Sequence, residues 1–169
     1  GGAGTIDLNE LDAVTLADVA TTDGAITITS GNTMTVTAVD AQDAGADESH
    51  DVSLTTVAGD IVLTTVTADD QITLNAAGAI TDNNGAATNL TGLVLDATAA
   101  SGIDIDTTVG SITAVLSAAG AIDINEIECD DDRRRDHDQC RRYAHRHGRR
   151  CPGCRCGRNA QCVPDHDGR

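Results

Sequence analysis

The residues best suited to hold a metal ion lie in one acidic segment, DAQDAGADESHD, at positions 40–51. It contains five carboxylates and one glycine that lets the chain turn, the acids being Asp40, Asp43, Asp47, Glu48 and Asp51. Carboxylate oxygens are the hard ligands that Ca²⁺ prefers, but the spacing does not follow the EF-hand register. A calcium site, with Asp40, Asp43 and Asp47 as its first ligands, and a solvated acidic loop are both compatible with this segment.

A second group of potential ligands lies near the C-terminus, in CPGCRC at 151–156. Cys151 and Cys154 are separated by two residues, the spacing at which two thiolates reach one Zn²⁺. Cys156 and Cys162 could complete four ligands. No second Cys-x2-Cys or His-x3–5-His pair closes such a site, so a zinc-binding knuckle remains an alternative interpretation.

Catalytic groups are scarce in residues 1–128, which contain a single histidine, His50, and no Cys, Lys or Arg. Nucleophile–base pairs and cations that stabilise an oxyanion are therefore largely missing. His50 stands in the most polar stretch of this region, where a solvated loop is the expected structure. We expect no enzymatic activity and no cofactor, apart from the Ca²⁺ considered above.

Charge divides the chain of 169 residues at residue 128. Residues 1–128 carry 20 Asp and Glu and no basic residue, whereas residues 129–169 carry 11 Arg and 7 Asp, which together give the net charge of −16. A surface as acidic as the first region repels phosphate backbones, so we expect no nucleic-acid partner. No window reaches the roughly 18 apolar residues of a membrane span, so we expect no membrane insertion.

The chemistry-bearing residues must be positioned by short strands, because aliphatic residues recur at i and i+2 throughout residues 1–128. This period of two is typical of half-buried strands, and successive pairs start roughly 8–13 residues apart. The pattern Gly-x-Ile occurs six times, and the segments between the aliphatic pairs are rich in Gly, Asn and Asp, which favour turns. The pairs are Ile6/Leu8, Val14/Leu16, Ile26/Ile28, Met34/Val36, Val52/Leu54, Ile61/Leu63, Ile72/Leu74, Leu93/Leu95, Ile103/Ile105 and Ile122/Ile124.

The core must be thin, because the chain has no Phe or Trp and its one Tyr is Tyr143. A β-sandwich of this size normally fills its interior with several large rings. A β-solenoid stacks small aliphatic residues in a narrow interior, and each coil contacts only its neighbours. The sequence therefore predicts an all-β fold with a β-solenoid over residues 1–128, and a β-sandwich is the alternative.

Segments 24–39 (GAITITSGNTMTVTAV) and 59–85 (GDIVLTTVTADDQITLNAAGAITDNNG) resemble the β-helical repeats of filamentous-haemagglutinin-like exoproteins, which are large bacterial surface and secreted proteins. The resemblance implies an extracellular or cell-surface rod with a structural or adhesive role. Its partners would be neighbouring repeats of a longer chain and host or cell-surface ligands. Because the sequence begins Gly-Gly-Ala-Gly, we interpret it as a fragment. A Ca²⁺-dependent extracellular binding module built on a sandwich is the alternative function.

Residues 129–169 change composition abruptly, since Thr, Ser, Ile and Leu are absent from them. The segment GAIDINEIE (120–128) aligns with GTIDLNELD (4–12), and the correspondence stops at Cys129. A segment rich in Asp, Arg, His and Cys becomes rich in Thr, Ala and Val when its codons are read one base forward. We therefore interpret 129–169 as a frame-shifted segment. A disordered basic tail and a metal or disulfide module are the alternatives.

The frame-shift hypothesis predicts the nucleotide sequence. Read one base forward from codon 110 to the end, the gene should yield a Thr-, Ala- and Val-rich continuation of the repeats after residue 128. Sequencing the gene checks this, and stop codons or unrelated residues in the shifted frame would contradict it.

Overall fold

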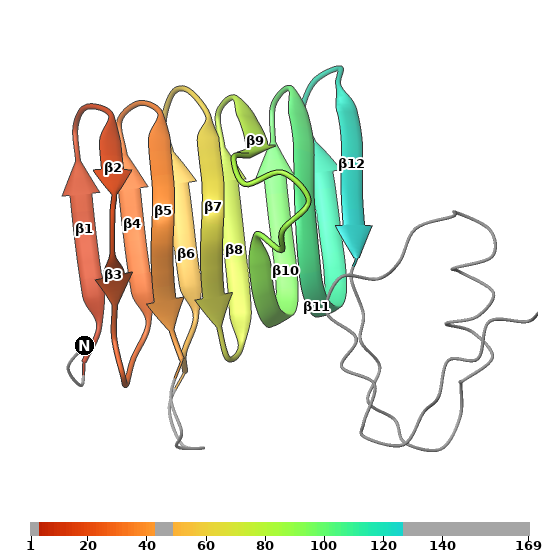
Figure 1. The fold of residues 1–169 in the computed structure, drawn as a ribbon. Helices are drawn as coiled ribbons and strands as arrows, with labels where there is room; N and C mark the ends of the chain where they lie inside the picture. Colours follow the sequence, from red (N-terminus) through yellow and green to blue (C-terminus); the bar gives the residue numbers. More distant parts are fainter. Residues whose placement is uncertain (1–3, 43–48, 127–169) are drawn as a thin grey trace, which may run out of the picture. The chain divides into compact units, whose positions relative to one another are not determined.

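The computed structural model describes residues 4–42 and 49–126, and the elements formed by these residues are all β-strands (Figure 1). Every strand pairing among them is parallel. The strands are β1 (Ile6–Glu10), β2 (Val14–Leu16), β3 (Val19–Ala20), β4 (Ile26–Ser30), β5 (Met34–Ala41), β6 (Val52–Thr56), β7 (Ile61–Ala68), β8 (Gln71–Ala76), β9 (Ala79–Asp82), β10 (Leu90–Ala99), β11 (Gly102–Leu116) and β12 (Ala121–Glu126).

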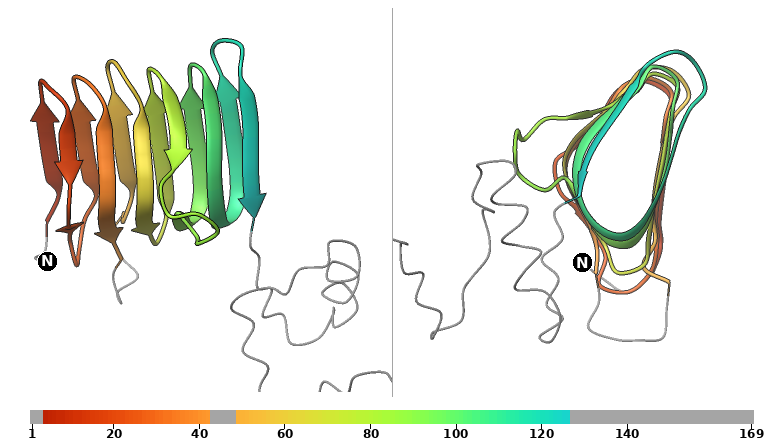
Figure 2. Two further views of the ribbon diagram at one scale, coloured as in Figure 1. Left: turned by 45° about the horizontal axis from the view of Figure 1, so that its top comes forward. Right: turned by 90° about the vertical axis from the view of Figure 1, so that its right-hand side faces the viewer.

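The strands form two faces of a β-solenoid. The first face consists of β1, β4, β6, β8 and the C-terminal parts of β10 and β11. The second face consists of β2 and β3, β5, β7, β9, the first residues of β10, the N-terminal part of β11, and β12. Viewed along the stack, the coils superpose on one narrow closed outline (Figure 2).

Six coils of unequal length make up the solenoid. On the first face Ile6 pairs with Ile26, Ile26 with Val52, and Val52 with Ile72, so a coil takes 20, 26 and 20 residues in turn. The extra residues of the long coil lie between β5 and β6, in a stretch that includes the undescribed positions 43–48. The register of the strands is therefore kept while the corners vary in length.

Columns of aliphatic side chains fill the interior. On the first face Ile26, Val52, Ile72 and Leu95 stack in one column, and each is 0% exposed. Met34, Ile61, Ile80 and Ile103 form the facing column of the second face. No aromatic side chain takes part in this core. The predicted solenoid with a thin, ring-free core is confirmed, and its all-parallel pairing rules out the antiparallel sandwich.

Glycine is required where one coil passes close to the next. Gly24 has φ +117°, and a Cβ there would lie 2.8 Å from the carbonyl carbon of Gly4 in the preceding coil. Gly59 has φ +82° at the corner before β7. Positive φ and close backbone approach both exclude larger residues. Two of the Gly-x-Ile motifs thus begin at corners that glycine alone fits.

One member of a predicted pair is wrong. Leu93 is 58% exposed, whereas the buried residues of β10 are Leu90, Leu95, Ala97 and Ala99. The strand passes from the second face to the first at this point, where the Asp70 carbonyl accepts the backbone N–H groups of both Leu93 and Val94, at 2.9 and 3.1 Å. Two consecutive outward residues shift the alternation, which a strict period of two does not anticipate.

The columns predict which substitutions destabilise the fold. We expect Leu54→Ala to lower the free energy of unfolding by about 2–5 kcal/mol, because it leaves a cavity in a fully buried column. Thr55→Ala, on the same strand but facing outward, should change it by less than about 0.5 kcal/mol. Urea unfolding followed by circular dichroism measures both variants, and equal losses would contradict the columnar core.

Candidate functional site

Acidic side chains at the corners accept hydrogen bonds from the backbone of an adjacent coil. Asp60 Oδ1 accepts the N–H of Ala79 at 2.7 Å, and Asp51 Oδ1 accepts the N–H of Gln71 at 3.0 Å. In each case donor and acceptor are 19 or 20 residues apart, which is one coil. Hydrogen bonds to a carboxylate are stronger than neutral ones. These aspartates therefore fasten one coil to the next.

The corners need such acceptors, because strands diverge there and their backbone N–H groups leave the ladder. A buried N–H without a partner costs free energy comparable to a lost hydrogen bond. Besides the carboxylates, the buried hydroxyl of Thr56 donates to the carbonyl of Gly59 and accepts the N–H of Ala77, at 3.0 and 3.2 Å. At the corners, hydrogen bonds to short polar side chains thus replace the backbone hydrogen bonds of the sheet.

In the last described coil, the carboxylate of Glu126 makes hydrogen bonds of the same kind. Glu126 is the last described residue of β12 and pairs with Thr107 of β11. Glu126 Oε1 accepts the backbone N–H of Val109 at 2.9 Å, and Oε2 accepts the hydroxyl of Thr107 at 2.6 Å. The carboxylate of Glu126 therefore fastens β12 to the preceding coil.

The structure describes only one of the three residues predicted to bind calcium. Asp40 lies exposed on β5, and its Oδ1 accepts the N–H of Gln42 at 3.1 Å. Asp43 and Asp47 lie outside the described residues. Asp51 uses both oxygens, since the Ser49 hydroxyl donates to Oδ2. Within 4–42 and 49–126, no three His, Cys, Asp or Glu side chains are grouped as metal ligands would be.

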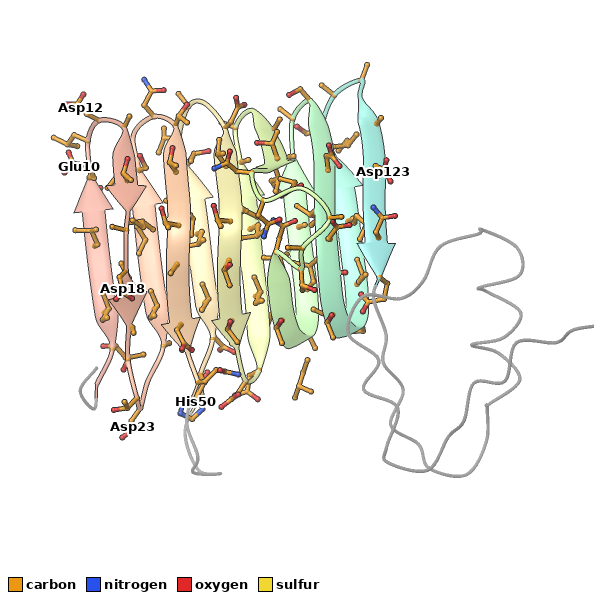
Figure 3. The ribbon with its side chains drawn as sticks, in the orientation of Figure 1. Glu10, Asp12, Asp18, Asp23, His50 and Asp123 are labelled. Atoms are coloured by element: carbon orange, nitrogen blue, oxygen red, sulfur yellow. The ribbon has the colours of Figure 1, made fainter. Side chains whose placement is uncertain are left out.

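The acids labelled in Figure 3 lie at different places on the solenoid. Glu10 and Asp12 lie at one rim of the first coil, whereas Asp18 and Asp23 lie toward its other rim, and Asp123 belongs to the opposite end of the solenoid (Figure 3). The fold therefore distributes these carboxylates over the surface. The zinc candidates Cys151, Cys154, Cys156 and Cys162 lie outside the described residues, as does all of 129–169.

His50 is buried, contrary to the solvated loop expected from its polar neighbours. Its side chain is 2% exposed at a corner, and its backbone N–H donates to Asp70 Oδ2 at 3.2 Å (Figure 3). The reason is periodicity. His50, Val52 and Leu54 are alternate residues that share the inward face, so the pattern of β6 already runs through position 50.

Asn89 is the important residue that the sequence did not reveal. It is 0% exposed, and its Nδ2 donates to Asp82 Oδ1 at 2.8 Å and to Asn84 Oδ1 at 3.0 Å. Its Oδ1 accepts the N–H of Asp106 at 2.8 Å, in the following coil. Asn89 thereby ties the loop between β9 and β10 to two coils. The segment TDNNG (81–85) indicated this loop, but no local signal distinguishes a buried asparagine from a turn residue.

No family model, curated protein or solved structure matches this chain in sequence or fold comparisons. In the part of the chain that the structure describes, no helix is long and apolar enough to span a membrane. The contacts of the described residues join coil to coil. Aliphatic columns do this in the interior, and carboxylates, hydroxyls and an amide do it at the corners.

The corner hydrogen bonds predict a specific effect of Asp60. We expect Asp60→Ala to lower the free energy of unfolding by about 1–3 kcal/mol, because the N–H of Ala79 loses its acceptor. Asp60→Asn should retain part of that stability, since its amide oxygen can still accept. Chemical unfolding of the full chain measures the difference.

Asp96→Ala is the matched control, because it removes the same charge from an outward position in the middle of β10. Both alanine variants relieve the same net repulsion, so the difference between them isolates the corner hydrogen bond. Equal stabilities of the two variants would refute the fastening role of Asp60.

Proposed function

We propose that residues 1–128 form a structural or adhesive repeat segment of a bacterial cell-surface or secreted rod-like protein, with no catalytic activity. The observation that carries the proposal is the stack of six coils in register, which share one continuous interior. Such an assembly acts by holding its two ends apart at a fixed separation, and this is a mechanical function.

The coil is the unit of length. Neighbouring strands of a sheet lie about 4.8 Å apart, so each added coil lengthens the solenoid by about that distance. Stability is approximately a sum of coil and nearest-neighbour terms, so coils can be added without redesigning the rest. A segment of this kind suits a spacer in a longer protein whose neighbours are further repeats.

The outward side of the first face supports the adhesive part of the proposal. It presents short polar side chains in rows along the stack, with Thr27, Ser53 and Thr73 in one row and Thr29, Thr55 and Asn75 in the next. A sheet face of short side chains offers a broad surface to a host or cell-surface ligand. With the acidic residues it also keeps the rod hydrated outside the cell, where we place it.

The rod and its alternative, a Ca²⁺-dependent binding module, differ in their response to calcium. If the stack is held by its own columns and corners, millimolar Ca²⁺ should leave the melting temperature of the full chain unchanged. A specific site filled at 100 times its dissociation constant would add about 2.7 kcal/mol. Thermal unfolding by circular dichroism, with Ca²⁺ and with a chelator, measures the shift.

Mg²⁺ at the same concentration serves as the control for screening of the acidic surface. A rise of several degrees in the melting temperature with Ca²⁺ but not with Mg²⁺ would favour the Ca²⁺-dependent binding module over the rod. If the full chain hydrolysed a polysaccharide, measured as released reducing ends, the proposal that it has no catalytic activity would be overturned.

A further inference from the structure

The aliphatic columns are open at both ends of the described solenoid. In the column that begins with Leu8, the next three residues are 0–1% exposed, while Leu8 itself is 39% exposed. At the other end Ile112 is 39% and Ile122 is 46% exposed, although their counterparts one coil earlier, Leu95 and Ile103, are 0% and 1%. The terminal coils expose the same surface that the inner coils bury.

The two ends are complementary in strand direction. β1 and β2 form the N-terminal edge, and among the described residues each pairs on one side only, with β4 and β5 respectively. β12 and residues 111–116 of β11 form the C-terminal edge in the same way. Because all strands are parallel, a C-terminal edge placed on an N-terminal edge continues the ladder that already joins the coils.

We propose that this solenoid stacks head to tail, with the last coil of one copy binding the first coil of a second copy of the chain. The inference rests on the fold alone and concerns end coils that no further repeat covers, so it is tested on the chain of 169 residues. The interface is an extension of the coil-to-coil contact, and it uses the same backbone hydrogen bonds and the same columns.

The side chains at the two ends fit this arrangement. Extending the register places Ile112 on Ile6 and Ala114 on Leu8 of the next copy, so that the small alanine meets the most exposed leucine of its column. On the second face the extension places Ile122 on Val14 and Ile124 on Leu16. These four contacts pair aliphatic residues of both ends, as the inner coils do.

Charge sets the conditions under which the ends meet. Residues 1–128 carry no basic residue and 20 acids, so two copies repel each other at low ionic strength. The edge segment Ser111–Leu116 is itself uncharged, and uncharged edge strands are prone to pair. The Debye length falls from about 10 Å at 0.1 M salt to about 3 Å at 1 M. Stacking should therefore strengthen as salt is added.

A head-to-tail contact does not close on itself, so repeated stacking yields filaments rather than dimers. Sedimentation velocity and negative-stain microscopy of the full chain, at increasing protein concentration and in about 0.1 M and about 1 M NaCl, test this. We expect filaments one solenoid wide whose length rises with concentration and with salt. A monomer under all conditions overturns the proposal.

Single-edge variants test the polarity of the contact. Leu8→Asp places a charge in the N-terminal end of a column and Ile112→Asp places one in the C-terminal end, so each variant alone should remain monomeric. An equimolar mixture retains one intact edge of each kind and should form heterodimers that grow no further. Dimerisation of Leu8→Asp alone would show a symmetric contact between C-terminal edges and would overturn the head-to-tail proposal.

The matched control is Thr113→Asp, which adds the same charge to the same edge strand at an outward position. It should still form filaments in high salt. Circular dichroism of each variant checks that the coils remain folded. If Ile112→Asp loses its last coil, Leu8→Asp with wild-type protein decides the question, because it should cap filaments at one end and shorten them.

Discussion

The parallel, in-register pairing of successive coils is the constraint on which the rest of this structure depends. It brings the same position of each coil directly above the last, so that Ile26 lies on Val52 and Val52 on Ile72. Small aliphatic residues then fill the interior completely, because each one is covered above and below by another of similar size. Large rings are unnecessary in a core that is only two side chains thick.

The same constraint explains how residues 1–128 can fold although they are acidic and contain no Lys or Arg. Corner aspartates lie one coil away from backbone N–H groups that the ladder no longer satisfies, and they accept hydrogen bonds from them, as Asp51 and Asp60 do. Backbone donors therefore take the place that lysine and arginine would have beside these carboxylates.

The proposed rod and the proposed filaments would both follow from the same repetition. A structure stabilised by contacts between nearest neighbours has no internal reason to stop at a given coil, and its terminal coils present the surface that its inner coils bury. Glu126 satisfies part of the last edge with its carboxylate, yet Ile112 and Ile122 remain exposed. If the end coils associate as proposed, the length of the assembly depends on how those coils are covered.

The sequence by itself determined the strands, the thin core and the solenoid, because these follow from alternation, glycine spacing and the absence of rings. Tertiary structure alone decided which face each strand joins. GTIDLNELD and GAIDINEIE are near copies, yet β1 lies on the first face and β12 on the second. Leu93 is exposed because its strand changes face, which the local alternation does not show. A period of two describes a strand locally, whereas the face it joins and the place where its alternation shifts depend on how the corners close each coil.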